Sequence, residues 1–594
     1  MKEKSTLFYI CLLCAAMLPV ALQGQFLFTT NNDGSLNILA YEGSGGTVII
    51  PTTTNGLPIT SIGDFAFEEG NMHKLTSVTI SDSIATIGYQ SFSGCSILTN
   101  VIFGNSVTDI GYESFQGCTG LKNISIPNSV TGIGGYTFLG CIGLTNITLG
   151  DGVSDIESAF YGCTALKTIT IPNSVTSIGV YSFYGCSSLA SITIPNRVTT
   201  IGQSAFQNCI SLTNACIGTN VTSIGFGAFY ECTSLTSITI PNSVTIIGEA
   251  AFLGCARMTN ALIGNGVTNI GVSAFYCTNL IAITVDTNNP AYCDVGGVLF
   301  DKNQTTLIEC PGVGKIGSYT IPDTVTNILA SAFALCTSLT GIIVGSNNAA
   351  YCSSDDVLLN KSQTAIIVYP QSKDGSYIVP NTVTNIGDWA FMACIALTSV
   401  IIPDGISGIG SNAFYSCTSL TNAVLGNGIT RIGYLDFQYC TGLKHITIPS
   451  SVTNLDNFVF EYCTNLMAVY FLGNAPTVGS SVFLNPPTGK SYNPIIYYLP
   501  GTTGWSVFSG GPGFSTKLWI PQMQISAFGV QTNQFGFTTT VGVGLTKIVV
   551  QACTNLSKPV WQSVSTNTLP TGSGYFSDPQ WTNYPGRFYR IRSP

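Results

Sequence analysis

The chain has 594 residues, of which 8% are charged and 45% are hydrophobic, and it contains 64 glycines and 21 cysteines. Ordinary globular chains have about 25% charged residues, so a series of compact domains of average composition is not expected. A formal net charge of −8 with only 20 basic residues excludes nucleic acid as an expected partner. The chain has only two histidines, so neither histidine-based catalysis nor a histidine-rich metal site is expected.

The first 24 residues have the pattern of a secretory signal peptide. Lys2 and Lys4 precede an uncharged apolar run over residues 7–21, and a basic start followed by such a run is typical of export signals. The run is shorter than the roughly 20 residues that a transmembrane helix needs. We therefore expect residues 1–24 to be removed and the mature chain, without a transmembrane helix, to be secreted or associated with the cell surface.

A repeat of 23 residues organises most of the chain. Fourteen cysteines follow it from Cys95 to Cys463, and fourteen phenylalanines keep the same register from Phe92 to Phe460. One residue is lost in each of the repeats that end at Cys163 and Cys277. A fixed period of this length is typical of a solenoid and cannot be explained by several unrelated compact domains.

A single repeat predicts the local structure. Ile238 and Ile240 alternate with polar residues, as in a half-buried strand, and Pro241 ends the strand because it has no N–H to donate. A repeat this small cannot bury its own apolar side, so repeats must stack on one another. We predict a solenoid over residues 75–465, with one parallel β-sheet along one face.

The repeat sequence LTSITIPNSVTIIGEAAFLGC resembles the BspA-type leucine-rich repeat, a bacterial cell-surface variety of 23-residue repeat. The resemblance covers about residues 25–520, and residues 25–74 resemble the N-terminal cap and first coil of that family. It implies the solenoid fold and a role in adhesion or binding at the bacterial cell surface.

Two repeats, residues 280–338 and 339–395, are enlarged and similar to each other. The segment VLFDKNQTTLI indicates a β-hairpin around Asp301–Gln304. Interruptions of this kind are places where ligands can dock, although they are equally a common variant of the repeat.

The pattern decays after Cys463. Residues 466–520 are rich in Pro and Gly and are expected to cap the last apolar edge. Residues 521–594 contain short strand-like runs separated by turn residues, which predicts a small antiparallel β-sandwich. This module serves either surface retention or a stable chain end.

The cysteine spacing argues against disulfides and metal sites. Neighbouring cysteines of the repeat would lie about 4.8 Å apart with parallel side chains, which is a poor geometry for a disulfide. Cys293 and Cys352 correspond across the two enlarged repeats and would be too far apart to bond. We expect free, buried thiols. No closely paired cysteines suit zinc in the mature chain, and neither a metal nor a cofactor is expected.

The outward positions of the predicted face carry mainly Ser, Thr and Asn, and no Asp or Glu. The paired carboxylates of polysaccharide-cleaving enzymes are therefore missing there. The face becomes more apolar toward its C-terminal end, and an apolar patch can mark a partner site; filling by residues of high β-propensity would produce the same pattern. The candidate ligand-binding residues, with a lone histidine that has no catalytic partner in register, are Ile343, Ile401, Val424, His445 and Tyr470.

These observations favour an exported, non-enzymatic scaffold for adhesion or for binding a protein or polysaccharide ligand outside the cell. Two alternatives remain open. One is a carbohydrate-active enzyme whose acids come from the hairpins, at Asp294, Glu309 and Asp355. The other is a passive structural surface protein. Adjacent Asp355 and Asp356 are able to hold calcium or are simply solvated.

Overall fold

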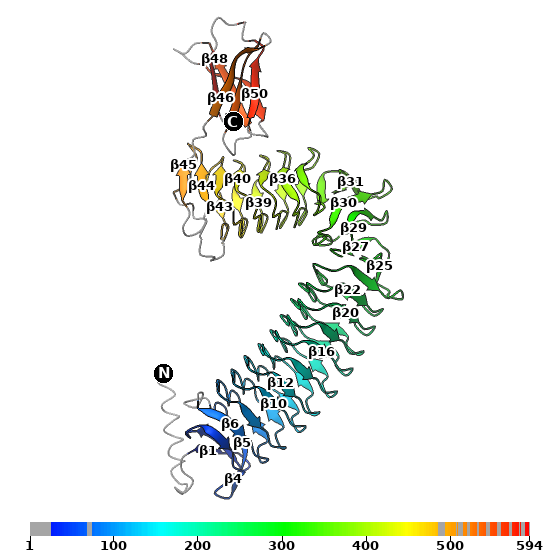
Figure 1. Cartoon of the computed structure of the whole chain (residues 1–594), viewed down its shortest axis with the longest axis vertical. Coiled ribbons are helices and arrows are strands. Elements are labelled where there is room, and N and C mark those ends of the chain that lie inside the picture. Colours follow the sequence, from blue (N-terminus) through cyan, green and yellow to red (C-terminus); the bar gives the residue numbers. More distant parts are fainter. Residues whose placement is uncertain are drawn as a thin grey trace. The chain divides into compact units, whose positions relative to one another are not determined.

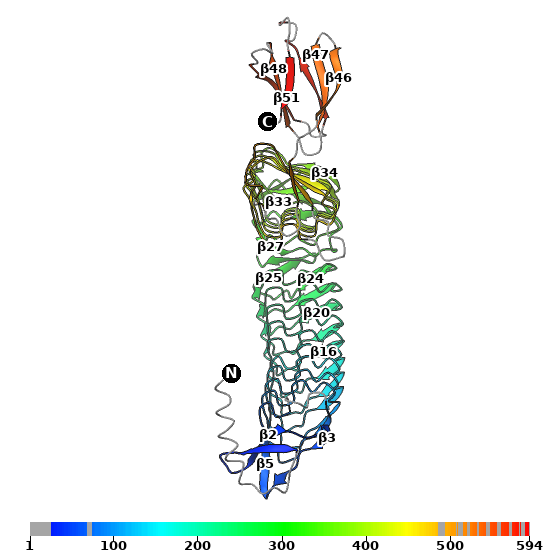
Figure 2. The same ribbon diagram turned by 90° about the vertical axis from the view of Figure 1, so that its left-hand side faces the viewer.

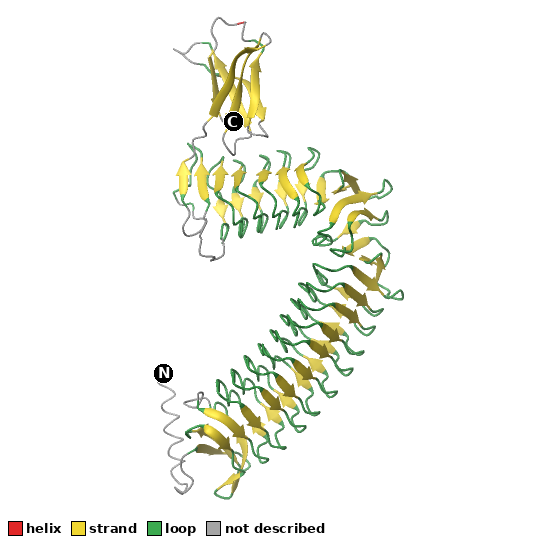
Figure 3. Ribbon diagram, viewed as in Figure 1, coloured by secondary structure: helices red, strands yellow, loops and turns green. Residues whose placement is uncertain are grey.

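The computed structural model describes residues 25–67, 74–484, 494–506, 508, 515–518, 523–531, 534–541, 547–554, 560–568, 573–580, 583 and 588–592. The expected signal peptide, residues 1–24, lies outside these ranges. The described residues form β-strands joined by turns and loops, without an α-helix (Figures 1 and 3). Contacts divide the chain into unit 1, Met1–Gly314 with Asn327–Leu335, and unit 2, Lys315–Thr326 with Cys336–Pro594.

Each coil of the solenoid begins with a strand on its face. In β20 (Ser237–Ile240), Ile238 and Ile240 point inward and are 1% and 2% exposed. This strand pairs in parallel with β22 (Asn260–Ile263) of the next coil. Pro241 follows β20 and ends the strand, as the sequence predicts. We call these strands the face strands.

The rest of a coil consists of a short back strand and a tight turn. The back strand of the same coil is β21 (Ile246–Ile247), and residues 248–255 form what we call the turn edge. A Cβ added at Gly248 would lie 2.6 Å from the backbone of Gly225 in the preceding coil. Only glycine therefore lets neighbouring coils approach this closely. The back strands pair in parallel as well and form a second sheet beside the one that the repeat predicts.

In unit 1 the coils follow one another in single file, with the face strands along one side (Figure 2). The chain opens with β1 (Phe26–Thr30) and β2 (Leu36–Tyr41), an antiparallel pair, and with β4 (Thr53–Thr54), which pairs with the first back strand. The face strands are β3 (Gly46–Ile49), β6 (Leu75–Thr79), β8 (Asn100–Ile102), β10 (Asn123–Ser125), β12 (Asn146–Thr148), β14 (Thr168–Thr170), β16 (Ser191–Thr193), β18 (Asn214–Cys216), β20, β22 and β24 (Ala282–Val285). The back strands are β5 (Leu57–Ile62), β7 (Thr86–Ile87), β9 (Asp109–Ile110), β11 (Gly132–Ile133), β13 (Asp155–Ile156), β15 (Ser177–Ile178), β17 (Thr200–Ile201), β19 (Ser223–Ile224), β21 and β23 (Asn269–Ile270).

The phenylalanine of each coil stacks on that of the next inside unit 1. The rings of Phe229 and Phe252 have centroids 5.3 Å apart and planes inclined by 6°, and both side chains are fully buried. The same stacking runs from Phe67 to Phe275. The predicted shared column of phenylalanines is confirmed.

The repeated cysteines are buried beside this column. From Cys118 to Cys277 each is a free thiol that donates to a phenylalanine carbonyl of the preceding coil, with Sγ to oxygen distances of 3.1–3.3 Å. Burial raises the pKa of the Cys141 thiol to about 12. The expectation of free, buried thiols is confirmed for these cysteines. It is wrong for burial at Cys216, which is exposed on the face, and at Cys293 and Cys352, which are half-buried.

The first enlarged repeat adds an antiparallel hairpin at the end of unit 1. Its strands are β25 (Tyr292–Val295), β26 (Val298–Asp301) and β27 (Thr306–Glu309), and β27 runs parallel to the back strand β29 (Asn327–Ile328). The Asp301 carboxylate accepts hydrogen bonds from the backbone N–H groups of Thr305 and Thr306, both at 2.7 Å, which fixes the turn. The predicted hairpin is confirmed.

Unit 2 repeats this architecture. Its face strands are β28 (Gly317–Ile321) and β30 (Leu339–Val344), which pair with each other, and β34 (Gly375–Ile378), β36 (Leu397–Ile401), β38 (Asn422–Val424), β40 (His445–Ile448), β42 (Ala468–Phe471), β44 (Ile495–Tyr498) and β45 (Thr516–Leu518), which form one sheet. The second hairpin comprises β31 (Tyr351–Ser354), β32 (Val357–Asn360) and β33 (Ala365–Val368). The back strands are β35 (Asn385–Ile386), β37 (Gly408–Ile409), β39 (Arg431–Ile432), β41 (Asn454–Leu455) and β43 (Thr477–Val478).

The C-terminal residues form two antiparallel sheets, as the sequence predicts for a sandwich-like module. One sheet has the order β46 (Met523–Gln531), β47 (Gln534–Val541), β50 (Ser573–Asp578), and the other has the order β49 (Gln562–Thr568), β48 (Lys547–Cys553), β51 (Phe588–Arg592). Ile548 and Val550, which alternate along β48, are fully buried.

Candidate binding surfaces

The face of unit 1 is neutral and polar. Its outward residues in the described strands are mostly Ser, Thr and Asn and include no charged side chain. Some of them bond across coils, as where the Asn100 amide donates to the Ser77 hydroxyl at 3.1 Å. Apolar residues are isolated on this face; Ile102 and Leu262 are 52% and 46% exposed. Such a surface offers weak hydrogen bonds and little area for apolar contact.

Threonines beside the back strands serve the stack itself. The hydroxyl of Thr222 donates to the carbonyl of Thr199 at 3.0 Å, and that of Thr245 donates to the carbonyl of Thr222 at 3.1 Å. These bonds repeat from coil to coil and add hydrogen bonds between neighbouring coils at the solvent boundary. The high Ser and Thr content of the chain is thus partly structural.

The face of unit 2 carries a continuous row of larger side chains. Strand register places Ile378 opposite Ile401, Ile401 opposite Val424, and Tyr470 opposite Tyr497. The Thr447 side chain lies between Val424 and Tyr470 in this register. We call these six residues, Ile378, Ile401, Val424, Thr447, Tyr470 and Tyr497, the apolar row.

The two tyrosines of the apolar row stack on each other. Their ring centroids are 5.0 Å apart and their planes are inclined by 14°. Burial, followed by the neighbouring Tyr497, raises the pKa of Tyr470. Ile378 begins the row and is 67% exposed. The row therefore combines exposed aliphatic surface with a pre-stacked aromatic pair.

Two candidate residues from the sequence lie outside this row. Ile343 is 43% exposed but belongs to β30, where it pairs with Thr320 of β28. The Ile342 N–H donates to the Asp356 carbonyl at 2.8 Å, so the turn between β31 and β32 borders β30. His445 lies in β40 two residues before Thr447 and pairs with Ala468 of β42. Burial, followed by Lys444, lowers the pKa of His445.

Sequence reasoning missed Ile378 and Tyr497. Ile378 lies in GSYIVP, which matches the strand-then-proline ending of the regular repeat. Tyr497 lies in NPIIYYLP, where a run of residues with high β-propensity also ends at a proline. Both segments have the pattern of a face strand. Because the 23-residue spacing is lost around them, the sequence does not show which residues they pair with.

The acids considered for catalysis have local structural roles. Oxygens of the Asp294 carboxylate accept hydrogen bonds from the N–H groups of Val285 at 2.9 Å and Gly297 at 3.4 Å. Glu309 is 7% exposed, and burial raises its pKa well above the ordinary value. A raised pKa keeps this carboxyl neutral to higher pH.

The adjacent acids Asp355 and Asp356 share one lysine. The Lys373 ammonium nitrogen lies 3.4 Å from a carboxylate oxygen of Asp355 and 4.0 Å from one of Asp356. Among the described residues, no group of three or more His, Cys, Asp or Glu side chains is arranged to hold a metal ion. The described part of the chain also lacks a helix with the length and hydrophobicity needed to span a bilayer.

Comparison with known proteins identifies the repeats. The profile of the BspA type leucine-rich repeat region, which represents six copies, matches residues 49–158, 157–281, 311–372 and 367–488. A search of curated proteins found no significant match.

The solved structures that match this chain include three bacterial leucine-rich repeat proteins. A leucine-rich cell surface protein from Faecalibacterium prausnitzii has 22% identity, covers 84% of this chain and 100% of its own, and gives a TM-score of 0.31. A leucine-rich repeat protein from Bacteroides ovatus has 23% identity, covers 84% of this chain and 100% of its own, and gives a TM-score of 0.36. A leucine-rich repeat protein from T. pallidum has 26% identity, covers 37% of this chain and 90% of its own, and gives a TM-score of 0.28. Because the family profile spans more than half of the residues, the chain belongs to the BspA-type leucine-rich repeat family.

Proposed function

We propose that the chain is an exported, non-catalytic scaffold that binds a protein or polysaccharide ligand at the bacterial cell surface through the apolar row of unit 2. The apolar row is the observation that carries this proposal. Ile378 is exposed and the other five residues of the row are half-buried. The apolar surface that they leave in water in register on one sheet gains free energy when a partner covers it.

The scaffold suits recognition because the row is rigid before the ligand arrives. Its side chains project from strands whose inward neighbours are buried; Val400 and Ile446, for example, are 0% and 1% exposed. Tyr470 and Tyr497 are already stacked, so little side-chain entropy remains to be lost on binding. Aromatic residues with a polar tip are also enriched where proteins meet partners.

The proposal gives the other segments of the chain the following roles. Residues 1–24 direct export, residues 25–74 cap the first coil, and residues 75–465 form the solenoid. Residues 466–520 cap its other end, and residues 521–594 contribute retention at the surface or a stable terminus. Ile343 and His445 are retained as lesser contacts flanking the apolar row.

Binding of the purified mature chain to an array of glycans and extracellular host proteins tests the proposal. The double variant Tyr470→Ser, Tyr497→Ser should weaken binding of at least one ligand found on the array by about tenfold or more, because two stacked aromatic contacts are lost. The matched control is Leu262→Ser, which removes an exposed apolar residue from the face of unit 1 and should leave the affinity unchanged.

Two outcomes would count against the proposal. Absence of any ligand on the array would favour a passive structural protein. Glycan cleavage detected by product analysis, and lost in Asp294→Asn or Asp355→Asn, would favour the enzyme.

A further inference from the structure

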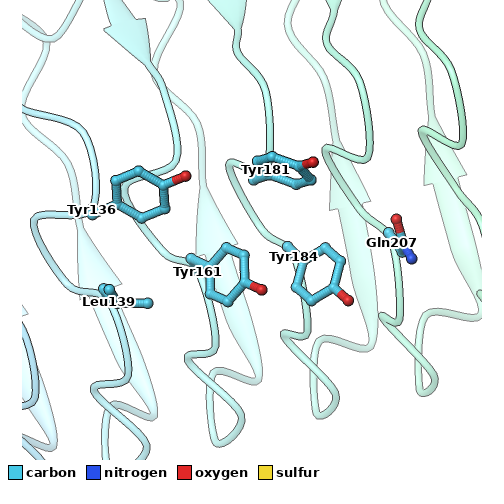
Figure 4. Close-up of a pocket in the computed structure, with 6 residues that line it drawn as sticks. All are labelled: Tyr136, Leu139, Tyr161, Tyr181, Tyr184 and Gln207. Carbon is cyan, nitrogen blue, oxygen red and sulfur yellow. The ribbon is translucent and has the colours of Figure 1, made fainter.

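The turn edge of unit 1 contains an open groove lined by four tyrosines. It has a volume of about 490 Å³ and is lined by Tyr136, Leu139, Tyr161, Tyr181, Tyr184 and Gln207 (Figure 4). This volume falls within the range of small-molecule and cofactor sites, about 300–1,000 Å³. The groove lies away from the face strands, on the loops that precede the buried cysteines.

The groove occurs where one coil is a residue short. Three residues separate Ile156 from Phe160, whereas four separate Ile178 from Phe183 in the next coil. The shortened turn brings Ser158 to the position that larger side chains occupy in the neighbouring coils. The deletion visible in the sequence therefore coincides with the hollow.

Ser158 has a small side chain and lies between two tyrosines of the neighbouring coils. Tyr136, Ser158 and Tyr181 occupy corresponding places on successive coils and share a left-handed backbone, with φ of 58°, 53° and 56°. The Ser158 hydroxyl is turned back onto the chain and donates to the Val180 carbonyl at 2.7 Å. The Ser158 side chain is 5% exposed and does not belong to the groove lining, and we call the space between the Tyr136 and Tyr181 rings the notch.

Tyr161 lies between the walls of this notch. Its ring centroid is 6.0 Å from that of Tyr136 and 6.1 Å from that of Tyr181, with planes inclined by 53° and 72°. Tyr184 stacks on Tyr161 with centroids 4.6 Å apart and extends the aromatic surface toward Gln207. Figure 4 shows the four phenol oxygens on the side of their rings nearer to Gln207.

The lining is neutral but rich in hydroxyl groups. None of its six residues carries an ionisable acid or base other than the phenols, and burial, followed by the neighbouring tyrosines, raises the pKa of Tyr161. The Tyr184 oxygen accepts a hydrogen bond from the Asn208 amide at 3.3 Å, which orients it. Phenol and amide groups both donate and accept hydrogen bonds.

The occupant that matches this chemistry has C–H surfaces, many hydroxyls and no charge. The negative faces of aromatic rings attract weakly positive C–H groups, while the phenol and amide groups can exchange hydrogen bonds with hydroxyls. The lining residues come from four consecutive coils, which at about 4.8 Å per coil extends the groove over roughly 14 Å. An extended ligand fits that length better than a compact head group.

We propose that this groove binds a segment of a neutral polysaccharide, with sugar rings packed against Tyr161 and Tyr184 between Tyr136 and Tyr181. Proline-rich peptides also bind aromatic grooves. Proline has no N–H to donate, so such a peptide would leave several hydrogen-bond acceptors of this groove without a donor. The site is independent of the apolar row on unit 2.

Filling the notch is the sharpest test. Ser158→Tyr should place a third ring between Tyr136 and Tyr181 without removing any lining residue, and the backbone accepts tyrosine because both neighbours adopt the same φ. The full mature chain would be screened on an array of neutral glycans and then titrated calorimetrically with cellohexaose, xylohexaose and mannohexaose. We expect at least one to bind, and Ser158→Tyr and Tyr161→Ala each to weaken it by about tenfold or more.

The controls separate this site from other surfaces. Tyr439→Ala removes a stacked tyrosine from the turn edge of unit 2, where Tyr439 and Tyr462 also lie 4.6 Å apart, and should leave oligosaccharide affinity unchanged. The Tyr470→Ser, Tyr497→Ser variant should also leave oligosaccharide affinity unchanged. The test of the groove therefore does not depend on whether the apolar row binds a ligand. Circular dichroism and thermal melting should confirm that every variant is folded.

Three results would overturn the proposal. One is that no neutral glycan binds. Another is that folded Ser158→Tyr binds the oligosaccharide as tightly as the natural chain. The third is that a proline decamer or tetramethylammonium binds in a Ser158→Tyr-sensitive manner while the sugars do not, which would assign the groove to a peptide or a cation.

Discussion

Unit 1 and unit 2 have nearly the same interior and different surfaces. The rings of Phe206 and Phe229 in unit 1 have centroids 5.1 Å apart, and those of Phe414 and Phe437 in unit 2 are also 5.1 Å apart. Outside, the face of unit 1 is mainly Ser, Thr and Asn, whereas that of unit 2 carries the apolar row. Interior side chains must fit identical neighbours above and below, and outward side chains meet no such requirement. Recognition is therefore expected where the surfaces differ.

The largest effects should come from the shared interior. Phe229→Ala and Phe437→Ala each remove a fully buried ring and should each lower the free energy of unfolding by about 3–5 kcal/mol. Urea unfolding measures both, and Phe226→Ala, which removes a ring that is 48% exposed, is the control. A large loss in one unit with almost none in the other would contradict a common interior.

A buried acid is an exception within the interior of unit 2. Asp436 takes the place that Ala228 and Ala251 hold in unit 1, is 0% exposed, and accepts hydrogen bonds from the N–H groups of Gly433 and Ala413 at 2.6 and 3.3 Å. Burial raises its pKa from 3.8 to about 8 despite these bonds.

Because this pKa is higher in the folded state, the folded chain keeps a proton that the unfolded chain loses as pH rises from about 4 to 8. Stability from this group is complete below pH 4 and falls toward pH 8. Asp436→Ala should remove that fall, so relative to the natural chain it should gain stability steadily between pH 4 and pH 8, by up to about 1.4 kcal/mol per pH unit. Parallel pH series of urea midpoints would show no such divergence if Asp436 were solvated.

Close stacking at the turn edge predicts a smaller effect. Gly248→Ala puts a Cβ 2.6 Å from the backbone of the preceding coil and should cost about 1–2 kcal/mol in unfolding free energy. Gly405→Ala in unit 2 meets nothing within 4 Å and should change stability by less than about 0.5 kcal/mol. Equal losses at both glycines would contradict coil spacing as the cause, since the lower backbone entropy of the unfolded chain would by itself stabilise an alanine variant.

Surface substitutions should have the smallest effect on stability. Ile378→Ser replaces a residue that is 67% exposed at the start of the apolar row, and we expect a change below about 0.5 kcal/mol in thermal or urea unfolding. A larger loss would mean that the row is held by packing, which would weaken the distinction between interior and surface.

The interior could be predicted from the sequence because the same residues recur. Phe252 and Cys255 stand at fixed positions in a 23-residue period, and stacking is the only way for such short repeats to bury them. The hairpin at Asp301–Gln304 was also predictable, since polar turn residues there separate two short runs with apolar residues. The second sheet of two-residue strands was not, because two residues carry no periodic signal.

The surfaces depend on register and on local exceptions. Ile343 was grouped with Ile401, but the backbone of Asp356 pairs beside β30 and places Ile343 in another sheet. Tyr497 escaped notice because the regular spacing is lost before it. The tyrosine groove depends on the orientation of Ser158, and a deletion in the sequence does not reveal which way its hydroxyl turns.

The most direct test of the account is hydroxyl-radical footprinting of the full mature chain with and without the ligand recovered from the binding array. Mass spectrometry would measure side-chain oxidation residue by residue. We expect the ligand to reduce oxidation of Ile378, Tyr470 and Tyr497 and to leave Leu262 unchanged. Unchanged oxidation along the apolar row, with protection at the hairpins instead, would contradict the proposed binding face.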